Sequence, residues 1–348
     1  MSLAPFEGRA PLLDPGGLPP EAAQGIEGRS PLRLALSRLR TDRIAIVAGS
    51  LIVLMALLAI LAPIISSVTG HNPYNTNLLT GTTAFGQPLA PGQGGYLLGT
   101  DNGGRDILVR IAYGAQISLM VGILATLIAT VVGTVIGLFA GYYGGWIDAV
   151  LARLMDTVLS FPYVLLAIVL ASVFGASLPL TIGVIAFFSW AAIGRIVRGQ
   201  TLSHREKEYV EAAHAAGAGD LRIMFVDILP NLVAPIIVLG TLLVPTAIVF
   251  EATLDFLGVG VGPPIPTWGN MLSDAQNSGF VNWWFWIFPS IALLLTTLGF
   301  NLLGDSVRDA LDPRTERIFA TRRKGARSGG GGVQAGAGAA AAAGEAGS

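Results

Sequence analysis

Five long stretches without Asp, Glu, Lys or Arg constrain the fold of this chain more than any other feature. They cover residues 44–100, 111–147, 157–194, 228–250 and 275–304. A helix needs about 20 apolar residues to cross the hydrocarbon core of a bilayer, and each stretch is long enough. Charged residues make up only 12% of the chain, against about a quarter in soluble domains. The sequence therefore predicts an all-α integral membrane protein.

Six membrane-spanning helices are predicted from these stretches. The first stretch is apolar only to about residue 65 and then becomes rich in Asn, Thr, Gly and Pro, so it supplies one span and a loop. The third stretch is too long for one span, and its Gly175–Pro179 segment favours a turn that divides it. The expected spans are 44–65, 115–139, 147–173, 179–198, 232–254 and 284–304.

Proline and glycine residues inside these spans suit a membrane bundle. The prolines are Pro162, Pro235, Pro245 and Pro289, and neighbouring helices in a membrane tolerate the kinks that such residues cause. Gly133 and Gly137 form a GxxxG pair in the second span. This spacing favours close approach of another helix.

The distribution of Lys and Arg predicts the orientation of the chain. Six Arg precede Ile44, five Lys or Arg lie in 195–222, and seven lie in 308–327, whereas 258–283 has none. Cytoplasmic loops carry the excess of Lys and Arg, and an even number of spans places both termini on one side. We therefore expect both termini and the 201–231 loop to be cytoplasmic.

These features divide the chain into five parts. We expect a cytoplasmic N-terminal segment (1–43), a first span (44–65), an external loop (66–114), a membrane core (115–305) and a cytoplasmic tail (306–348). The first 30 residues, rich in Pro and Gly, and the Gly/Ala tail from about residue 328 are expected to be disordered.

Several kinds of site are excluded or disfavoured by the residue inventory. The chain has no Cys, and His71, His204 and His214 are too dispersed to suggest a metal site, so we expect them at the surface. Its two lysines, Lys207 and Lys324, do not lie in a phosphate-binding loop. We expect no catalytic site, cofactor or metal in this chain, and its net charge of -1 gives no sign of nucleic-acid binding.

The loop 201–231 is predicted to form two short helices outside the bilayer. Ser203 and Glu206 match a capping box that begins the first helix, and Gly217 suits the left-handed position that ends it. Asp220 suits the N-cap of the second helix, and Pro230 ends that helix. Such a pair could act as a lever moved by a cytoplasmic partner, or it could rest on the membrane surface as an amphipathic loop.

The same loop resembles the EAA loop of bacterial ABC importer permeases. The matching residues, at the family's spacing, are Glu211, Ala212, Ala213, Gly217, Leu229 and Pro230. One position where the family has Ile is Asp227 here. The resemblance implies that this loop docks into a cleft of an ATPase subunit and couples its motion to the membrane helices.

Four further segments resemble the C-type permease subunits of dipeptide and oligopeptide importers. They are Leu98–Asp106, Arg153–Pro162, Glu251–Gly269 and Gly304–Arg314, and the resemblance covers roughly residues 32–318. Asp255 stands where this family has a small polar residue. Arg153 and Asp156 could also form a simple ion pair on one helix face, because they are three residues apart.

The resemblance implies a type I ABC importer permease bundle in a bacterial inner membrane, surrounded by lipid. The implied partners are a second homologous permease subunit, two ATP-binding cassette subunits and an external substrate-binding protein. The chain would form half of a pore that transports by alternating access, with ATP hydrolysed by the partners. The implied cargo is di- or oligopeptides, with nickel chelates or other small solutes as alternatives.

Two other classes compete with an importer subunit: a self-sufficient secondary transporter or channel, and a membrane enzyme. A secondary transporter requires ionisable groups near the middle of the membrane, and the middle of each expected span lacks them. Glu251 and Asp255 are four residues apart near the outer end of a span. They could line the outer mouth of the pore and meet a substrate's amino group, or they could be solvated at the interface.

Overall fold

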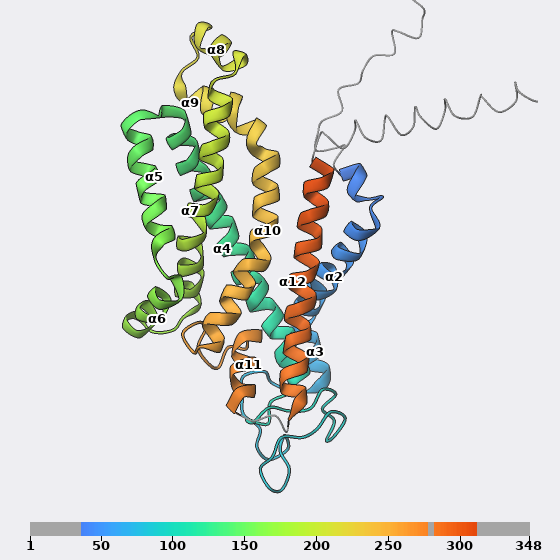
Figure 1. The fold of residues 1–348 in the computed structure, drawn as a ribbon. Helices are drawn as coiled ribbons and strands as arrows, with labels where there is room; N and C mark the ends of the chain where they lie inside the picture. Colours follow the sequence, from blue (N-terminus) through green and yellow to red (C-terminus); the bar gives the residue numbers. More distant parts are fainter. Residues whose placement is uncertain (1–35, 278–281, 312–348) are drawn as a thin grey trace, which may run out of the picture.

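A computed structural model describes residues 36–277 and 282–311 as a bundle of long helices (Figure 1). In this described part no β-strand forms, so the all-α prediction is confirmed. A π-helical turn, Ile223–Ile228, joins α9 to α10. The helices are α2 (Arg43–Ile60), α3 (Ala62–Thr69), α4 (Ile107–Tyr143), α5 (Gly145–Ser160), α6 (Tyr163–Phe174), α7 (Leu178–Arg205), α8 (Glu208–Ala215), α9 (Asp220–Arg222), α10 (Leu229–Phe256), α11 (Trp268–Asn277) and α12 (Trp283–Leu311).

Five helices of the described part are long and apolar enough to cross a membrane. They are α2, α4, α7, α12 and the continuous run 220–256 that contains α10. The pair α5 and α6 meets the same criterion together, but it is bent by 80°. The six predicted spans therefore correspond to five long helices and one bent pair.

The bend between α5 and α6 corrects the straight third span predicted for 147–173. Phe161 is extended, with φ -76° and ψ 135°, and Pro162 precedes the first residue of α6. Proline pushes the residue before it out of the helical region and lacks the N–H that a continuous helix needs. By contrast, Pro235, Pro245 and Pro289 lie inside helices, as expected.

The helices α4 and α7 form the most extensive helix pair of the bundle. A Cβ atom built on Gly133 would lie 2.5 Å from the carbonyl oxygen of Trp190, and one on Gly141 would lie 2.6 Å from the Cβ of Thr201. Glycine is therefore needed along this face of α4 for the two backbones to meet. The close approach predicted from the GxxxG pair is confirmed.

Both ends of the described chain lie at the end of the bundle that carries α8 (Figure 1). A guanidinium nitrogen of Arg38, just before α2, donates to the carbonyl oxygen of Ala310 in the last turn of α12, at 3.2 Å. The segment 70–106 and α11 lie at the opposite end. This arrangement agrees with an even number of crossings between the two termini.

Several predicted boundaries and pairs differ from the structure. The second membrane helix begins at Ile107 rather than at residue 115, because Asp106 caps it by accepting from the N–H of Leu108 at 2.8 Å. Asp156 pairs with Arg195 of α7 instead of its neighbour Arg153. The predicted disordered ends, 1–30 and 328–348, lie outside the described residues.

Candidate functional site

The helix α8 protrudes from one end of the bundle, between α7 and the run that leads into α10 (Figure 1). The capping box predicted from Ser203 and Glu206 is wrong, because α7 continues through Ser203 to Arg205. The helix α8 begins only at Glu208, after Lys207 as its N-cap. Thr201, in the last turns of α7, is fully buried against α4. This packing holds that part of α7 in its helical conformation.

The end of α8 has the backbone geometry that glycine permits. Gly217 has a φ of +79°, and its N–H donates to the carbonyl of His214 at 2.9 Å. The N–H of Ala218 donates to the carbonyl of Ala213 at 3.0 Å. These two bonds form a Schellman motif, which satisfies the last carbonyl groups of a helix. The left-handed geometry predicted for Gly217 is therefore confirmed.

The second predicted short helix of this loop is not separate. The run from Asp220 continues through a π-helical turn into α10, where the N–H of Leu229 donates to the carbonyl of Met224. Pro230 lies just after the π-helical turn, inside this continuous run, rather than ending a helix. Asp220 does not cap the run with its side chain, because Gly219 is the N-cap.

The residues of the EAA-like pattern fall into two groups in space. Glu211, Ala212 and Gly217 are exposed on α8 and its terminal turn, and Ala213 packs partly against the core. Leu229 and Pro230 lie in the first turn of α10, on the far side of the π-helical turn. The exposed group can meet another protein directly, whereas Leu229 packs against the buried cluster that contains Val210, and Pro230 is exposed on α10.

The inner face of α8 is held by apolar packing. Val210 is 1% exposed and packs in a cluster with Leu138, Ile223 and Met224. A polar contribution that sequence reasoning missed comes from Tyr142 of α4, whose hydroxyl bonds to residues on both sides of Gly217. No motif points to Tyr142, because its partners lie more than 70 residues further along the chain.

Asp227, which stands where the EAA pattern has Ile, acts on Tyr209 of α8. Burial, and secondarily the negative charge of Asp227, raise the pKa of the Tyr209 hydroxyl above its ordinary value. The same hydroxyl hydrogen-bonds to Nδ1 of His204 at 2.8 Å. Asp227, in the π-helical turn, therefore lies close enough to the start of α8 to act on Tyr209.

The two carboxylates of α10 do not lie at an open mouth. Glu251 is fully buried and Asp255 is 3% exposed. Asp255 accepts from the N–H of Val261 and from the hydroxyl of Thr267, and Ser118 of α4 donates to Glu251 at 3.2 Å. The expectation that they line the outer mouth or are solvated is therefore not met by the chain on its own.

These contacts make Asp255 the anchor of the turn between α10 and α11. A Cβ on Gly260 would overlap an Asp255 carboxylate oxygen, and one on Gly269 would lie 2.7 Å from the Cβ of Asp255. The chain thus folds back tightly over this side chain. Sequence spacing identified the two carboxylates as an i,i+4 pair, but it could not reveal the return of 259–269 that covers them.

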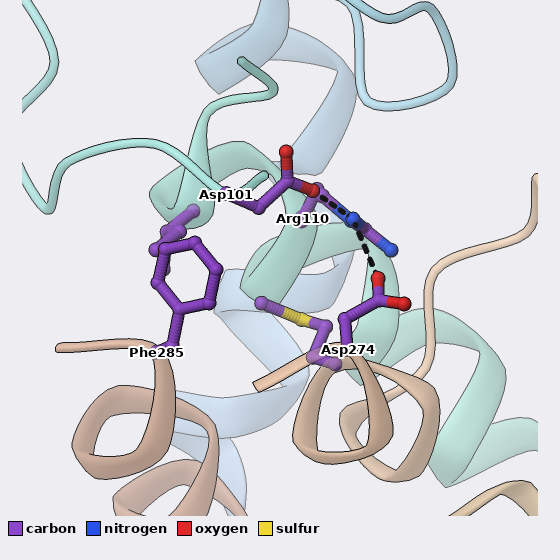
Figure 2. Close-up of a pocket in the computed structure, with 6 residues that line it drawn as sticks. Asp101, Arg110, Asp274 and Phe285 are labelled. Carbon is purple, nitrogen blue, oxygen red and sulfur yellow. Dashed lines mark hydrogen bonds and ion pairs between the residues drawn. The ribbon is translucent and has the colours of Figure 1, made fainter. Parts of the chain in front are cut away.

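A cluster of charged side chains lies at the start of α4 (Figure 2), at the end of the bundle opposite α8 (Figure 1). Arg110 is 2% exposed and pairs with Asp101, and it also lies 3.3 Å from Asp274 of α11. Arg105 pairs with the same two carboxylates, at 2.7 and 3.2 Å. Two guanidinium groups and two carboxylates thus neutralise one another where the segment 70–106 meets α4 and α11.

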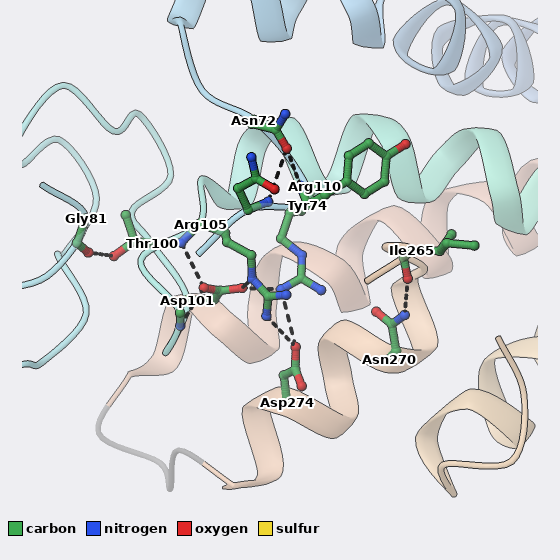
Figure 3. Close-up of polar contacts among 12 residues, drawn as sticks. Asn72, Tyr74, Gly81, Thr100, Asp101, Arg105, Arg110, Ile265, Asn270 and Asp274 are labelled. Atoms are coloured by element: carbon green, nitrogen blue, oxygen red, sulfur yellow. Dashed lines mark hydrogen bonds and ion pairs between the residues drawn. The ribbon is translucent and has the colours of Figure 1, made fainter. Parts of the chain in front are cut away.

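Hydrogen bonds fix the segment 70–106 beside this cluster (Figure 3). The hydroxyl of Thr100 donates to the carbonyl of Gly81 at 2.6 Å, and Trp284 of α12 donates to the carbonyl of Thr100 at 3.3 Å. Nδ1 of His71 lies 2.6 Å from Asp106, and its ring stacks on Tyr96 with centroids 4.2 Å apart. His71 is therefore packed rather than solvated, contrary to expectation.

The pocket within the charged cluster is too small for a peptide. Its empty space is about 210 Å³, including open solvent, and it is lined by Asp101, Ile107, Arg110, Met271, Asp274 and Phe285. Ligand pockets usually have volumes of about 300–1,000 Å³. This cluster therefore connects the segment 70–106 to α4 and α11 within the chain, and it is not a cargo site.

Two family models match this chain. Residues 133–317 match the binding-protein-dependent transport system inner membrane component. Residues 30–91 match the N-terminal transmembrane domain of oligopeptide transport permease C. The first match contains α8 and the helices around it, and the second contains α2 and the segment 70–91.

Curated relatives cover most of the chain. A dipeptide transport system permease protein of Alkalihalophilus pseudofirmus is 41% identical, over 87% of this chain and 97% of its own length. An oligopeptide transport system permease protein of Escherichia coli K12 is 42% identical, over 83% and 93%. A glutathione transport system permease protein of Salmonella typhi is 41% identical, over 82% and 91%.

One solved structure is also similar, an inward-facing form of the MetNI methionine ABC transporter. The TM-score is 0.49 at 17% identity, and the match covers 58% of this chain and 96% of that chain.

Proposed function

Since the chain belongs to the family of inner membrane components of binding-protein-dependent transport systems, we propose that it forms half of the pore of an ATP-driven importer. The pore alternates between inward- and outward-facing states when separate ATPase subunits close and reopen. The partners are two ATP-binding cassette subunits, a second homologous permease and an external substrate-binding protein. Hydrolysis takes place on the ATPase subunits, and this chain supplies the path.

The observation that carries this proposal is the exposed end of α8. Glu211, Ala212 and Gly217 form a small, rigid surface whose backbone is closed by the Schellman motif. A short helix that protrudes from the bundle suits a cleft in a partner protein. Because α8 is fixed between two membrane helices, a force on it is transmitted to α7 and α10.

The proposed cargo is di- or oligopeptides. The relatives named above are described as permeases for dipeptides, oligopeptides and glutathione, which all contain peptide bonds. Nickel chelates and other small solutes stay as alternative cargoes. The external binding protein would select among these.

The proposed orientation places α8 and both termini in the cytoplasm of a bacterial cell, with the chain in the inner membrane. The Arg-rich segments support it, because the described chain ends lie at the same end of the bundle as α8 (Figure 1). The segment 70–106 and α11 would then face the external binding protein. ATP would act on the α8 side only.

A self-sufficient secondary transporter or channel is the competing proposal. Such a protein would need ionisable side chains accessible from a pathway within the membrane. Glu251 and Asp255 are the acidic candidates on α10, and both are buried against hydroxyl and amide groups of the same chain. This burial favours a structural role for them and supports the importer proposal.

Co-purification with the ATPase subunits tests the proposal. The chain would be expressed with the transport proteins encoded beside it, extracted in mild detergent and purified through its own tag. We expect an ATPase to co-elute, and we expect Glu211→Lys to abolish co-elution without changing the melting temperature. Glu206→Lys, an exposed charge reversal just before α8, is the matched control and should retain the ATPase. Purification without any ATPase would overturn the importer proposal.

A further inference from the structure

Tyr142 occupies a distinctive place at the end of α4. It is 6% exposed and packs in the cluster that also holds Val210 of α8, whereas the next residue, Tyr143, is 40% exposed. The two tyrosines therefore share a helix end but only Tyr142 faces the coupling segment. Here the coupling segment means residues 201–231, the loop that carries α8.

Three parts of the coupling segment meet at Tyr142. Its hydroxyl donates to a carboxylate oxygen of Asp220 at 3.0 Å and lies 3.2 Å from Nε2 of His214. Its carbonyl oxygen accepts from the guanidinium of Arg205 at 3.0 Å. The ring is nearly parallel to that of His214, at an interplanar angle of 5°. One residue of α4 thus contacts the end of α7, the end of α8 and the start of α9.

The donors and acceptors present determine how the Tyr142 hydroxyl bonds to both His214 and Asp220. Nδ1 of His214 lies 3.1 Å from the carbonyl of Val210, which can only accept, so Nδ1 carries a proton. In a neutral imidazole Nε2 then accepts, and the single Tyr142 proton serves His214 or Asp220 at any moment. In an imidazolium both nitrogens donate, and all three bonds form together. In either case the hydroxyl binds one side of Gly217 or both.

A second directional contact of α8, the hydrogen bond between Tyr209 and His204 at 2.8 Å, joins it to the end of α7 and not to α4. Val210 and Ala213 hold the inner face of α8 by apolar packing, which depends little on direction. Hydrogen bonds weaken steeply when they are misaligned. The packing therefore sets the distance of α8 from the bundle, and the hydrogen bonds of Tyr142 set the orientation of α8 relative to α4.

The rest of α4 carries this connection through the bundle. The helix has 37 residues, or about 55 Å of length. It packs backbone to backbone on α7 at its glycines, bonds to Glu251 of α10 through Ser118, and carries Arg110 in the external charged cluster. A residue that fixes α8 to α4 thereby fixes it to every main part of the bundle.

From this geometry we infer that Tyr142 is the positioning residue of the coupling segment, holding α8 in one direction relative to α4. This inference rests on the proposed function for its consequence, which is that motion imposed on α8 by an ATPase moves α4 with it. Without the hydroxyl, α8 stays packed but tilts, and part of the imposed motion is lost.

Spin labels can test this because the chain has no native cysteine. Labels at Ala215→Cys on α8 and Val135→Cys on α4, both exposed positions, would report the distance between the two helices in lipid nanodiscs. We expect a narrow distance distribution in the otherwise unaltered chain. Tyr142→Phe keeps the ring and should raise the population at displaced distances about fivefold, the effect of losing one typical hydrogen bond.

Two further variants keep the test decisive. Tyr143→Phe removes a neighbouring hydroxyl and should leave the distribution unchanged. Asp220→Asn removes the charge of one acceptor and should broaden the distribution in the same direction as Tyr142→Phe. A Tyr142→Phe distribution as narrow as that of the reference chain would overturn the inference.

The same variants separate this inference from the proposed function. The distance measurement needs the permease alone, whereas the proposed function needs a co-eluting ATPase. With the ATPase present, we expect Tyr142→Phe to retain the ATPase but to transport less labelled dipeptide per ATP hydrolysed. A broadened distribution with no ATPase bound in any variant would contradict the proposed function and leave Tyr142 as a positioning residue of α8.

Discussion

A Cβ atom built on Gly137 of α4 would lie 2.5 Å from the carbonyl oxygen of Gly194 of α7. Real Cβ atoms do not approach an oxygen so closely, so the two helix backbones are in direct contact at this point. Membrane helices gain little from burying apolar surface against each other, and their association depends on such close packing. This contact therefore holds α4 against α7, the helix that leads into the coupling segment.

Gly137→Ala should destabilise the bundle, because its methyl group meets backbone rather than a movable side chain. We expect a loss of about 1–3 kcal/mol in the free energy of unfolding, typical of an overpacked site. Gly183→Ala on α7 is the matched control, because nothing lies within 4 Å of its Cβ position. Thermal unfolding in detergent, followed by tryptophan fluorescence, should show a lower midpoint for Gly137→Ala alone. Equal midpoints would contradict this account of the α4–α7 contact.

Gly217→Ala should loosen the end of α8 without affecting the bundle. Its φ of +79° costs a residue with a Cβ about 1–2 kcal/mol, although the space around it is open. Hydrogen–deuterium exchange should therefore become faster in α8 only. Gly219→Ala has equally open surroundings and an ordinary φ of -76°, so its exchange should not change. Equally faster exchange in both variants would contradict the claim that the left-handed backbone of Gly217 is what requires glycine there.

Arg110→Met should be more damaging than Arg105→Met. Both residues pair with Asp101 and Asp274, but the side chain of Arg110 is 3% exposed and that of Arg105 is 15% exposed. Removing one partner of a buried ion pair costs about 3–5 kcal/mol, because the remaining charge stays buried. We expect Arg110→Met to lower the melting temperature or prevent purification, with a smaller change for Arg105→Met. The reverse order would refute the central place of Arg110 in the charged cluster.

Asp255→Asn should destabilise the turn between α10 and α11. The carboxylate accepts from a backbone N–H and a hydroxyl, and an amide has only one accepting atom to serve both. A buried donor left without a partner costs about 1–3 kcal/mol. Limited proteolysis near residues 258–266 should become faster, whereas Glu251→Gln, whose partner is the hydroxyl of Ser118, should change it less. Unchanged proteolysis in Asp255→Asn would contradict the anchoring role.

Local patterns in the sequence were sufficient for the parts of the fold that depend on local physics. Charge-free stretches located the long helices, and the GxxxG pair identified the face of α4 that meets α7. The backbone of Gly217 followed from the need for a left-handed residue at a helix end. Each of these properties depends on a few neighbouring residues or on the solvent around a single helix.

Properties that depend on distant residues were missed or wrong. The hydrogen bond between Tyr142 and Asp220 joins residues 78 positions apart. No local pattern therefore indicated that the Asp220 side chain would bond to Tyr142 and not cap the helix. The burial of Glu251 and Asp255 depends on the return of 259–269 over them. The bend at Pro162 could have been predicted from the restriction on the residue before proline, but tolerance of proline in membrane helices favoured a straight span.

The most direct test of the account is ATP-dependent uptake by the assembled transporter in proteoliposomes. The chain would be reconstituted with its permease partner, ATPases and binding protein, with labelled di- and tripeptides outside and ATP inside. We predict uptake that requires ATP and is lost in Glu211→Lys, a variant that leaves the bundle folded. Uptake by this chain alone, driven by an ion gradient without an ATPase, would contradict the account and identify a secondary transporter.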